Sequence, residues 1–242
     1  MGEMVADYVD ENLSDAVIFG QEVTKEFLEG YKEKLGNHWR FYGSFRCNDK
    51  LARITKNWGN EAVGVLTKTE ASKQETIPLT STKQIKRLCQ RVDMEILGLP
   101  TATFTTHMEH KNHAVQQAEQ EEVIEAIQSA RYAGLPVILS AQQNVYSNSQ
   151  EFQEMQAKMG ALGMKPTIVN GRTYQGNVAD NPMDSPVSYI WYSDEFSLVD
   201  EGIIKEQPTE KHYPIYASLT LSEKGLEQLH QESQEKRSKH VI

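Results

Sequence analysis

The chain has 242 residues, of which 38% are hydrophobic, and a formal net charge of −9 at pH 7. This length and composition are sufficient for one large domain with a packed core. The negative charge repels phosphates, so it disfavours a nucleic-acid or phosphate ligand unless basic residues cluster locally.

No stretch approaches the roughly 20 apolar residues that a membrane span needs, and the acidic N-terminus has no signal-peptide core. We therefore expect no membrane association. The two cysteines, Cys47 and Cys89, show no metal-ligand spacing. We expect them to be buried free thiols in an intracellular, cytoplasmic protein.

Hydrophobic spacing predicts the elements of the first part of the chain in the order helix, strand, helix, strand, strand. The corresponding ranges are 3–12, 16–23, 24–35, 39–46 and 62–67. The polar residues 70–84 predict a loop. Residues 91–97 and 101–107 predict a hairpin that turns at Gly98.

The second part predicts a long helix, a short buried strand, a second helix, a long loop and two further strands. The ranges are 112–133, 137–139, 152–162, 170–186, 187–191 and 214–221. From Ser222 the tail is polar, which predicts a solvated helix or a frayed end. Strands that come in hairpin pairs, with helices between them, predict a mixed sheet or two stacked sheets with helices outside. We expect one domain over 1–221 and a polar tail over 222–242.

Polar residues follow several of the predicted strands, where α/β proteins often carry their chemistry. The stretches are GQEV (20–23), TTHME (105–109), LSAQQN (139–144), VSYI (187–190) and EKHYP (210–214). Taken singly, each has an ordinary structural interpretation: a surface glutamate, a hydrogen-bonded histidine, a turn asparagine or the entry to a strand.

Together, in this order over residues 4 to 221, the five stretches resemble the endonuclease/exonuclease/phosphatase family, which has the fold of DNase I. The resemblance implies an α+β fold, a four-layer α/β sandwich of two packed mixed sheets flanked by helices. In this family a first strand precedes the first helix, and we expect this chain to lack it. The resemblance gives Glu22 as a metal ligand, His107 as a phosphate contact, and Asn144 and His212 as further site residues.

This sequence departs from the family pattern at the acidic positions. Gln142, Ser188 and Lys211 stand where the family has aspartates, and Gln90 stands in the place of a glutamate. An amide cannot accept a proton from water, and loss of a positioned base typically costs about 10²–10⁴-fold in rate. We therefore expect an inactive scaffold or binding subunit with no cofactor, which retains a phosphate-binding pocket. Lys211 would either replace the metal as an internal cation close to Glu22 or point to solvent.

The absence of the first strand would expose main-chain donors and acceptors, so we expect a protein partner or a larger assembly to complete the open sheet. The alternative is an active phosphodiesterase or nuclease dependent on Mg²⁺ or Mn²⁺. In it, His212 and His107 would act as base and acid, and an aspartate from a loop would help to bind the metal. The candidates are Asp180, Asp184 and Asp194. If the stretches do not meet in space, the chain is an α/β domain of no assignable activity.

Two charged clusters have simpler explanations. A basic-aromatic cluster either stacks bases or places aromatics in the core with charges outside. It consists of Arg40, Arg46, Lys50, Arg53 and Lys56 with Trp39, Phe41, Tyr42 and Trp58. Four glutamates follow each other closely in the long helix, which predicts a solvated helix face. They are Glu119, Glu121, Glu122 and Glu125.

Overall fold

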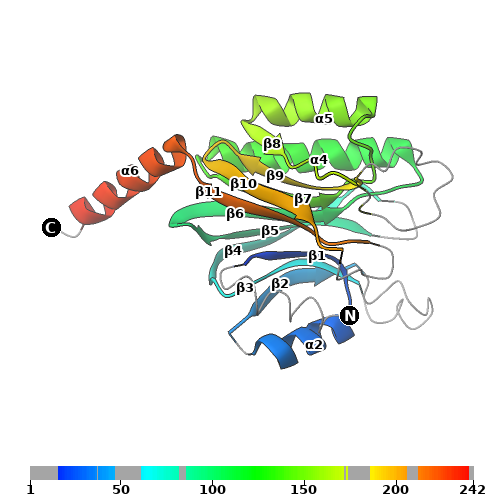
Figure 1. The fold of residues 1–242 in the computed structure, drawn as a ribbon, viewed down its shortest axis with the longest axis horizontal. Helices are drawn as coiled ribbons and strands as arrows, with labels where there is room; N and C mark the ends of the chain where they lie inside the picture. Colours follow the sequence, from blue (N-terminus) through cyan, green and yellow to red (C-terminus); the bar gives the residue numbers. More distant parts are fainter. Residues whose placement is uncertain are drawn as a thin grey trace.

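A computed structural model of the chain describes most of the residues, and Figure 1 shows its arrangement. The described ranges are 16–36, 38–46, 61–81, 86–171, 173, 186–205 and 212–239. The predicted helix at 3–12, Cys47 and most of the predicted loop at 170–186 lie outside these ranges.

The larger sheet runs through the centre of the molecule. It consists of β4 (Ala71–Leu79), β5 (Arg87–Ile96), β6 (Leu99–His107), β7 (Val137–Gln142), β8 (Met164–Pro166) and β9 (Ser188–Ser193). The strands lie in the order β4-β5-β6-β7-β9-β8. Only β6 and β7 are parallel to each other, so the sheet is mixed. This arrangement brings the ends of β6 and β7 to the same edge of the sheet.

Two helices cover one face of the larger sheet: α4 (His113–Tyr132) and α5 (Gln150–Ala161). The largest core cluster lies between them and the sheet, with Phe104, Leu139 and Trp191 from the strands and Ile127 and Phe152 from the helices. Asn112 and Ser149 cap these helices, because each side chain accepts a hydrogen bond from the main-chain N–H three residues later. Both helices are close to their predicted ranges.

The other face of the larger sheet packs against a second layer that is divided into two small sheets. One contains β1 (Ile18–Val23), β2 (Arg40–Phe45) and β3 (Ala62–Thr67) in the order β1-β3-β2. The other contains β10 (Phe196–Ile203) and β11 (Ile215–Leu221). Phe19 of β1 and Leu219 of β11 pack on the same cluster, around Ile138 and Ile190 of the larger sheet. The two small sheets therefore belong to one layer.

Helix α2 (Lys25–Leu35) forms the fourth layer and covers the outer face of β1, β2 and β3. Tyr31 of α2 is buried with Trp39 and Leu66. The order helix, sheet, sheet, helix confirms the predicted four-layer sandwich of two packed layers of strands flanked by helices. The second layer is divided between β1 and β11, since no hydrogen bonds join these two strands in the described part of the chain.

Three elements differ from the sequence prediction. Residues 71–79 form β4, whereas a loop was predicted for 70–84, and β8 and β10 were not predicted. β4 lies at the edge of its sheet and exposes most of its side chains, so it lacks the hydrophobic alternation that indicates a strand. Its hydrogen bonds to β5 hold it in place. The polar tail forms helix α6 (Glu223–Lys239).

None of the helices in the described ranges is both long and apolar enough to cross a membrane. The one cysteine within those ranges, Cys89, is a buried free thiol, as predicted, and burial raises its pKa to about 12.

Candidate functional site

Glu22 lies at the end of β1 and is turned out of the strand by a β-bulge. Gly20 pairs with Gly64 and Val23 pairs with Ala62, so β1 has one residue more than β3 in this interval. Glu22 itself has a φ of 62°, a left-handed conformation that is uncommon for a glutamate. A bulge of this kind redirects a side chain away from the regular alternation. As a result the Glu22 side chain is 42% exposed beside His107.

His107 ends β6 and is almost completely buried. Its Nδ1 atom lies 3.2 Å from Glu22 Oε1 and 2.7 Å from Nη2 of Arg46. Burial lowers the pKa of His107 to about 4, and the nearby charges of Arg46 and Arg87 also lower it. The hydrogen bond with Glu22 acts in the opposite direction and raises the pKa. The imidazole is therefore neutral at pH 7.

The pKa of Glu22 results from opposing influences. Burial raises it, but His107, Arg46 and His212 outweigh burial and hold the pKa below its usual value of 4.5. Arg46 is a permanent cation beside Glu22, and its charge lowers the pKa of Glu22 also at pH 7, where His107 is neutral. Arg46 Nη1 lies 4.0 Å from Glu22 Oε1.

Gln142 lies between His107 and Ser188 in one row across the larger sheet. It is the register partner of His107 on β6 and of Ser188 on β9. Its Nε2 donates to Oδ1 of Asn144 at 3.1 Å, and Nδ2 of Asn144 donates to the carbonyl of Met108 at 2.8 Å. Asn144 has a φ of 56°, which asparagine adopts more readily than most residues. Gln142 and Asn144 are therefore joined by an amide hydrogen bond, and Gln142 is next to His107 and Ser188 in the sheet.

His212 precedes β11, in a segment held by a hydrogen bond from the N–H of Tyr213 to the carbonyl of Thr173. Its charge contributes to the lowered pKa of Glu22, which places it near the same cluster. Lys211, the predicted internal cation, lies outside the described residues, as do Asp180 and Asp184. Described residues from all five predicted stretches thus lie near one another, so the condition set for an α/β domain of no assignable activity, that the stretches do not meet in space, is not fulfilled.

Arg46 and Glu61 belong to the site but were not predicted as site residues. Nη1 of Arg46 lies 3.3 Å from Oε2 of Glu61, and the main-chain N–H of Arg46 donates to the carbonyl of Glu61. Burial and the charge of Glu22 raise the pKa of Glu61, against the effect of Arg46. Arg46 stood out in the sequence only as a member of the basic-aromatic cluster. Its partner Glu61 follows a stretch with no clear pattern.

The two interpretations of the basic-aromatic cluster are both incomplete. Trp39 is buried against α2, and Phe41 packs beside it, as expected for core aromatics. Arg46 was expected to carry its charge on the outer surface, but it is only 3% exposed and lies in the site. The remainder of the cluster beyond Arg46 lies outside the described residues.

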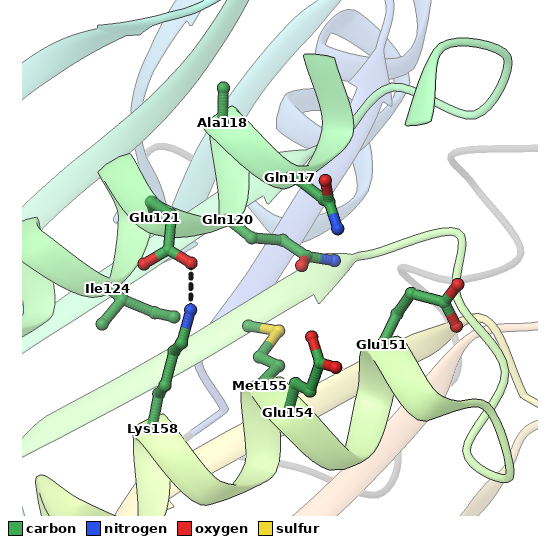
Figure 2. Close-up of a pocket in the computed structure, with 9 residues that line it drawn as sticks. All are labelled: Gln117, Ala118, Gln120, Glu121, Ile124, Glu151, Glu154, Met155 and Lys158. Carbon is green, nitrogen blue, oxygen red and sulfur yellow. Dashed lines mark hydrogen bonds and ion pairs between the residues drawn. The ribbon is translucent and has the colours of Figure 1, made fainter. Parts of the chain in front are cut away.

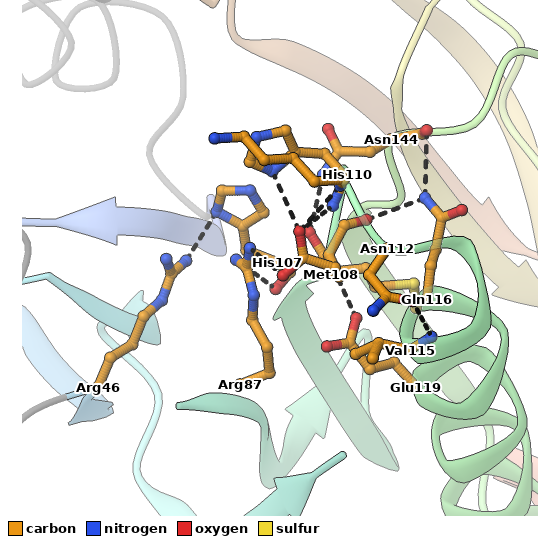
Figure 3. Close-up of polar contacts among 12 residues, drawn as sticks. Arg46, Arg87, His107, Met108, His110, Asn112, Val115, Gln116, Glu119 and Asn144 are labelled. Atoms are coloured by element: carbon orange, nitrogen blue, oxygen red, sulfur yellow. Dashed lines mark hydrogen bonds and ion pairs between the residues drawn. The ribbon is translucent and has the colours of Figure 1, made fainter. Parts of the chain in front are cut away.

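A network of buried polar groups lies beneath the site and connects it to α4 (Figure 3). Nη1 of Arg87 donates to the carbonyl of His107 at 3.2 Å, and Nη2 lies 3.5 Å from Oε2 of Glu109. The N–H of Glu109 donates to Oε2 of Glu119 at 2.6 Å. Nε2 of Gln116 lies within hydrogen-bonding distance of the carbonyls of Glu109, Gln143 and Asn144. This network fixes the turn that carries Asn144.

Glu119 does not belong to a solvated helix face. It is fully buried, and burial raises its pKa to about 7, so it is partly protonated at neutral pH. The prediction was wrong for this residue because Glu119 faces the sheet, where it caps the main chain at Glu109. The pattern of charges along a helix does not show which of its glutamates is buried against the sheet.

Two further residues have structural roles. Gln90 was placed at a site position by the resemblance, but it is fully buried in β5 and donates to the carbonyls of Glu75 and Arg91. Asp194 was a candidate for recruitment to a metal. It is paired with Arg131 at 3.0 Å and with Lys224 at 2.9 Å, at the turn between β9 and β10.

The described residues do not fit the divalent metal that the fold family implies. No three His, Cys, Asp or Glu side chains within the described ranges are arranged to hold a metal ion. Mg²⁺ prefers carboxylate and other oxygen ligands. The carboxylate of Glu22 has the guanidinium of Arg46 4.0 Å away, and Gln142 contributes a neutral amide that is hydrogen-bonded to Asn144.

A shallow groove between α4 and α5 is a separate feature (Figure 2). It is lined by polar side chains, by the ion pair of Glu121 with Lys158, and by the apolar side chains of Ala118, Ile124 and Met155. The predicted site residues are not among its lining residues. The candidate site is therefore the cluster at the strand ends.

No protein-family model matches the sequence, and a search of curated proteins found no significant match. Solved structures do match. The mannosyl-6-phosphatase Bt3783 of Bacteroides thetaiotaomicron VPI-5482 superposes with a TM-score of 0.70 at 16% identity, over 91% of this chain and 90% of that one. An endonuclease/exonuclease/phosphatase family protein from Bacteroides thetaiotaomicron gives 0.70 at 15% identity, over 92% and 86%.

The human Nocturnin catalytic domain, in a structure with a bound sulfate, gives a TM-score of 0.68 at 13% identity over 91% of this chain and 86% of that one. These similarities show that the chain has the DNase I-like fold of endonuclease/exonuclease/phosphatase proteins. They confirm the predicted fold. The identities are too low to transfer an activity.

Proposed function

We propose that this chain with a DNase I-like fold is a binding protein that does not hydrolyse phosphate esters and that retains a pocket for a phosphate group. One observation carries the proposal. The side chain in the centre of the site row, between His107 and Ser188, is the amide of Gln142, and it is already hydrogen-bonded to Asn144. The group that would have to activate water is therefore neutral and engaged.

The chemistry of the neighbouring groups supports the same conclusion. Metal-assisted hydrolysis needs charge neutralisation and a positioned base, and an amide supplies neither. His107 is neutral at pH 7 and contacts Arg46, so it is not a source of a proton for a leaving group. Glu22 remains as a carboxylate, but Arg46 is close to it.

A phosphate group would be held mainly by hydrogen bonds. Arg46, Arg87 and His212 are basic groups near the candidate site, and the acidic groups Glu22 and Glu61 partly cancel their charge. Hence we expect weak binding of free phosphate. A natural ligand would gain most of its affinity from contacts of its other groups, not from its phosphate. The sulfate in the Nocturnin structure is a precedent for an oxyanion on this fold.

The test is a hydrolysis assay with Mg²⁺ and with Mn²⁺, using a generic phosphodiester, a sugar phosphate, DNA and RNA. We expect no turnover above the buffer rate and no difference between the wild-type protein and His212→Ala. Binding of inorganic phosphate is measured on the same two proteins by calorimetry at millimolar concentrations. We expect heat of binding from the wild-type protein and less from His212→Ala.

The alternative function is a metal-dependent phosphodiesterase or nuclease that uses Mg²⁺ or Mn²⁺ with an altered set of residues. It is favoured by the exposure of the ionised Glu22 side chain and by the nearby Glu61. Asp180 and Asp184 would complete it. Turnover that requires a divalent metal and disappears in His212→Ala would establish this alternative and reject the binding protein.

We also propose a protein partner that adds an extended strand to the second layer. In the described part of that layer, β1 is hydrogen-bonded to β3 and β11 to β10, and none of these bonds joins β1 to β11. We call the part of the layer between β1 and β11 the interval. The apolar side chains of Phe19 on β1 and of Ala217 and Leu219 on β11 are only partly buried. An inserted strand would satisfy both edges with main-chain hydrogen bonds.

Hydrogen–deuterium exchange checks this expectation. In the purified monomer, peptides that cover 18–22 and 215–221 should exchange faster than the peptide that covers β6, which has a neighbour on each side. Slow exchange at both edges would mean that the chain itself or a second copy fills the interval. The mass in solution, measured by light scattering, then separates these two cases.

A further inference from the structure

Two groups of opposite charge meet the same nitrogen atom of His107. Nη2 of Arg46 lies 2.7 Å from Nδ1, and Oε1 of Glu22 lies 3.2 Å from the same Nδ1. Both distances are within hydrogen-bonding range. All three groups lie at the strand ends that form the candidate site, and the contact of Arg46 with the ring is drawn in Figure 3.

Only one of these contacts is a hydrogen bond when the ring is neutral. Neutral imidazole has one nitrogen that donates and one that accepts, whereas guanidinium only donates and an ionised carboxylate only accepts. A proton on Nδ1 would point toward Glu22 and would also face an N–H of Arg46 at 2.7 Å. Without that proton, Nδ1 accepts from Arg46, and its lone pair faces the carboxylate oxygen.

The geometry favours Arg46. Its contact is the shorter by half an ångström, and its position is fixed, because the side chain is 3% exposed and is held to Glu61 at 3.3 Å. Glu22 is 42% exposed, so water can solvate its oxygen and the carboxylate can turn away. Nη1 of Arg46, 4.0 Å from Oε1, also offsets the repulsion between Glu22 and the lone pair of the ring.

We infer that Arg46 is a positioning residue that holds His107 as the tautomer with a bare Nδ1 and a protonated Nε2. The Nε2–H group is then a neutral hydrogen-bond donor on the side of the ring away from Arg46. It is suited to an oxyanion acceptor, such as a phosphate oxygen. The tautomer is a property of the free protein and holds whether or not phosphate binds.

The test is the ¹⁵N spectrum of the imidazole nitrogens at pH 7, with the His107 signals assigned by their loss in His107→Ala. In the wild-type protein we expect the Nδ1 shift of an unprotonated nitrogen and the Nε2 shift of a protonated one. In Arg46→Met, Glu22 is the remaining partner of Nδ1, so we expect the proton to move to Nδ1. A wild-type ring with its proton on Nδ1 would overturn the inference.

A second variant keeps the test decisive if Arg46→Met does not fold, which its thermal unfolding curve reports. Glu22→Gln changes a partly exposed side chain and leaves the contact of Arg46 intact. We expect the wild-type tautomer in this variant, and a proton that moves between the nitrogens when Glu22 is replaced would contradict the role of Arg46. Inorganic phosphate is then added to the wild-type protein. An unchanged Nε2–H signal would count against the proposed phosphate pocket without affecting the assignment of Arg46.

Discussion

Replacing Glu195 with alanine is expected to lower the free energy of unfolding by about 3–5 kcal/mol, because it leaves the mostly buried guanidinium of Arg131, 12% exposed, without its main partner. Glu195 is 3% exposed. Its Oε2 lies 2.7 Å from Nη1 of Arg131, and its Oε1 lies 2.7 Å from Nζ of Lys224. Arg131 also donates to the carbonyls of Leu135 and Leu162. This cluster joins α4, the end of α5, the turn after β9 and the start of α6.

Urea unfolding followed by circular dichroism measures this loss. The matched control is Asp194→Ala, the neighbouring carboxylate, which also contacts Arg131 and Lys224 but is 39% exposed. Exposed ion pairs contribute about 0–1 kcal/mol, so the control should change stability by no more than that. Equal effects of the two substitutions would show that the burial of Glu195 is not the cause.

The same residue makes stability depend on pH. Burial raises the pKa of Glu195, but the hydrogen bonds from Arg131 and Lys224 outweigh burial and lower its pKa to about 2, from an ordinary value of 4.5. Because the pKa is lower in the folded state, the stabilisation is complete above pH 4.5 and is lost as the pH falls toward 2. The contribution is about 3 kcal/mol. Glu195→Gln should unfold with a smaller change in stability over this pH range than the wild-type protein.

Restoring the three carboxylates of the family pattern is expected to produce metal-dependent hydrolysis where the wild-type protein has none. The variant is Gln142→Asp with Ser188→Asp and Lys211→Asp. The first two positions are register neighbours next to His107, so their carboxylates would lie at the same strand ends as Glu22. A positioned base contributes about 10²–10⁴-fold, and we expect a rise of about 10² over the background rate.

The matched control places asparagine at the same three positions, which keeps the size of aspartate without its charge. Hydrolysis of a generic phosphodiester is measured with Mn²⁺, and binding of Mn²⁺ is followed by electron paramagnetic resonance. We expect binding and turnover only in the aspartate variant. If the wild-type protein binds Mn²⁺ at Glu22 with the same affinity as the aspartate variant, the missing carboxylates are not the cause of its inactivity.

Most of the fold could be predicted from local patterns. The periods of apolar residues identified α2, α4, α5 and most of the strands, and β3 has the predicted bounds. The elements that were missed lie at edges. β4 and β10 are held by main-chain hydrogen bonds to one neighbour, and such bonds have no signature in side-chain periodicity.

The site could be predicted in part, for a related reason. His107, Gln142, Asn144 and Ser188 come at or near the ends of strands of the larger sheet, and neighbouring strands of one sheet bring their ends together. Glu22 comes near the end of β1 in the second layer and reaches His107 by packing. Arg46 and Glu61 were missed because their link to His107 exists only after the smaller sheet packs against the larger one. That contact joins residues separated by 61 positions.

The sequence by itself determined the types of chemical groups: amides, a serine and a lysine where the family resemblance implies carboxylates, together with one glutamate and two histidines. These identities decide which protons can move, whatever the fold does. The tertiary structure decided the states of these groups. It buries His107 against Arg46, turns Glu22 outward on a bulge and encloses Glu119 beneath the site. Protonation and tautomer depend on burial and on neighbouring charges, and packing alone determines both.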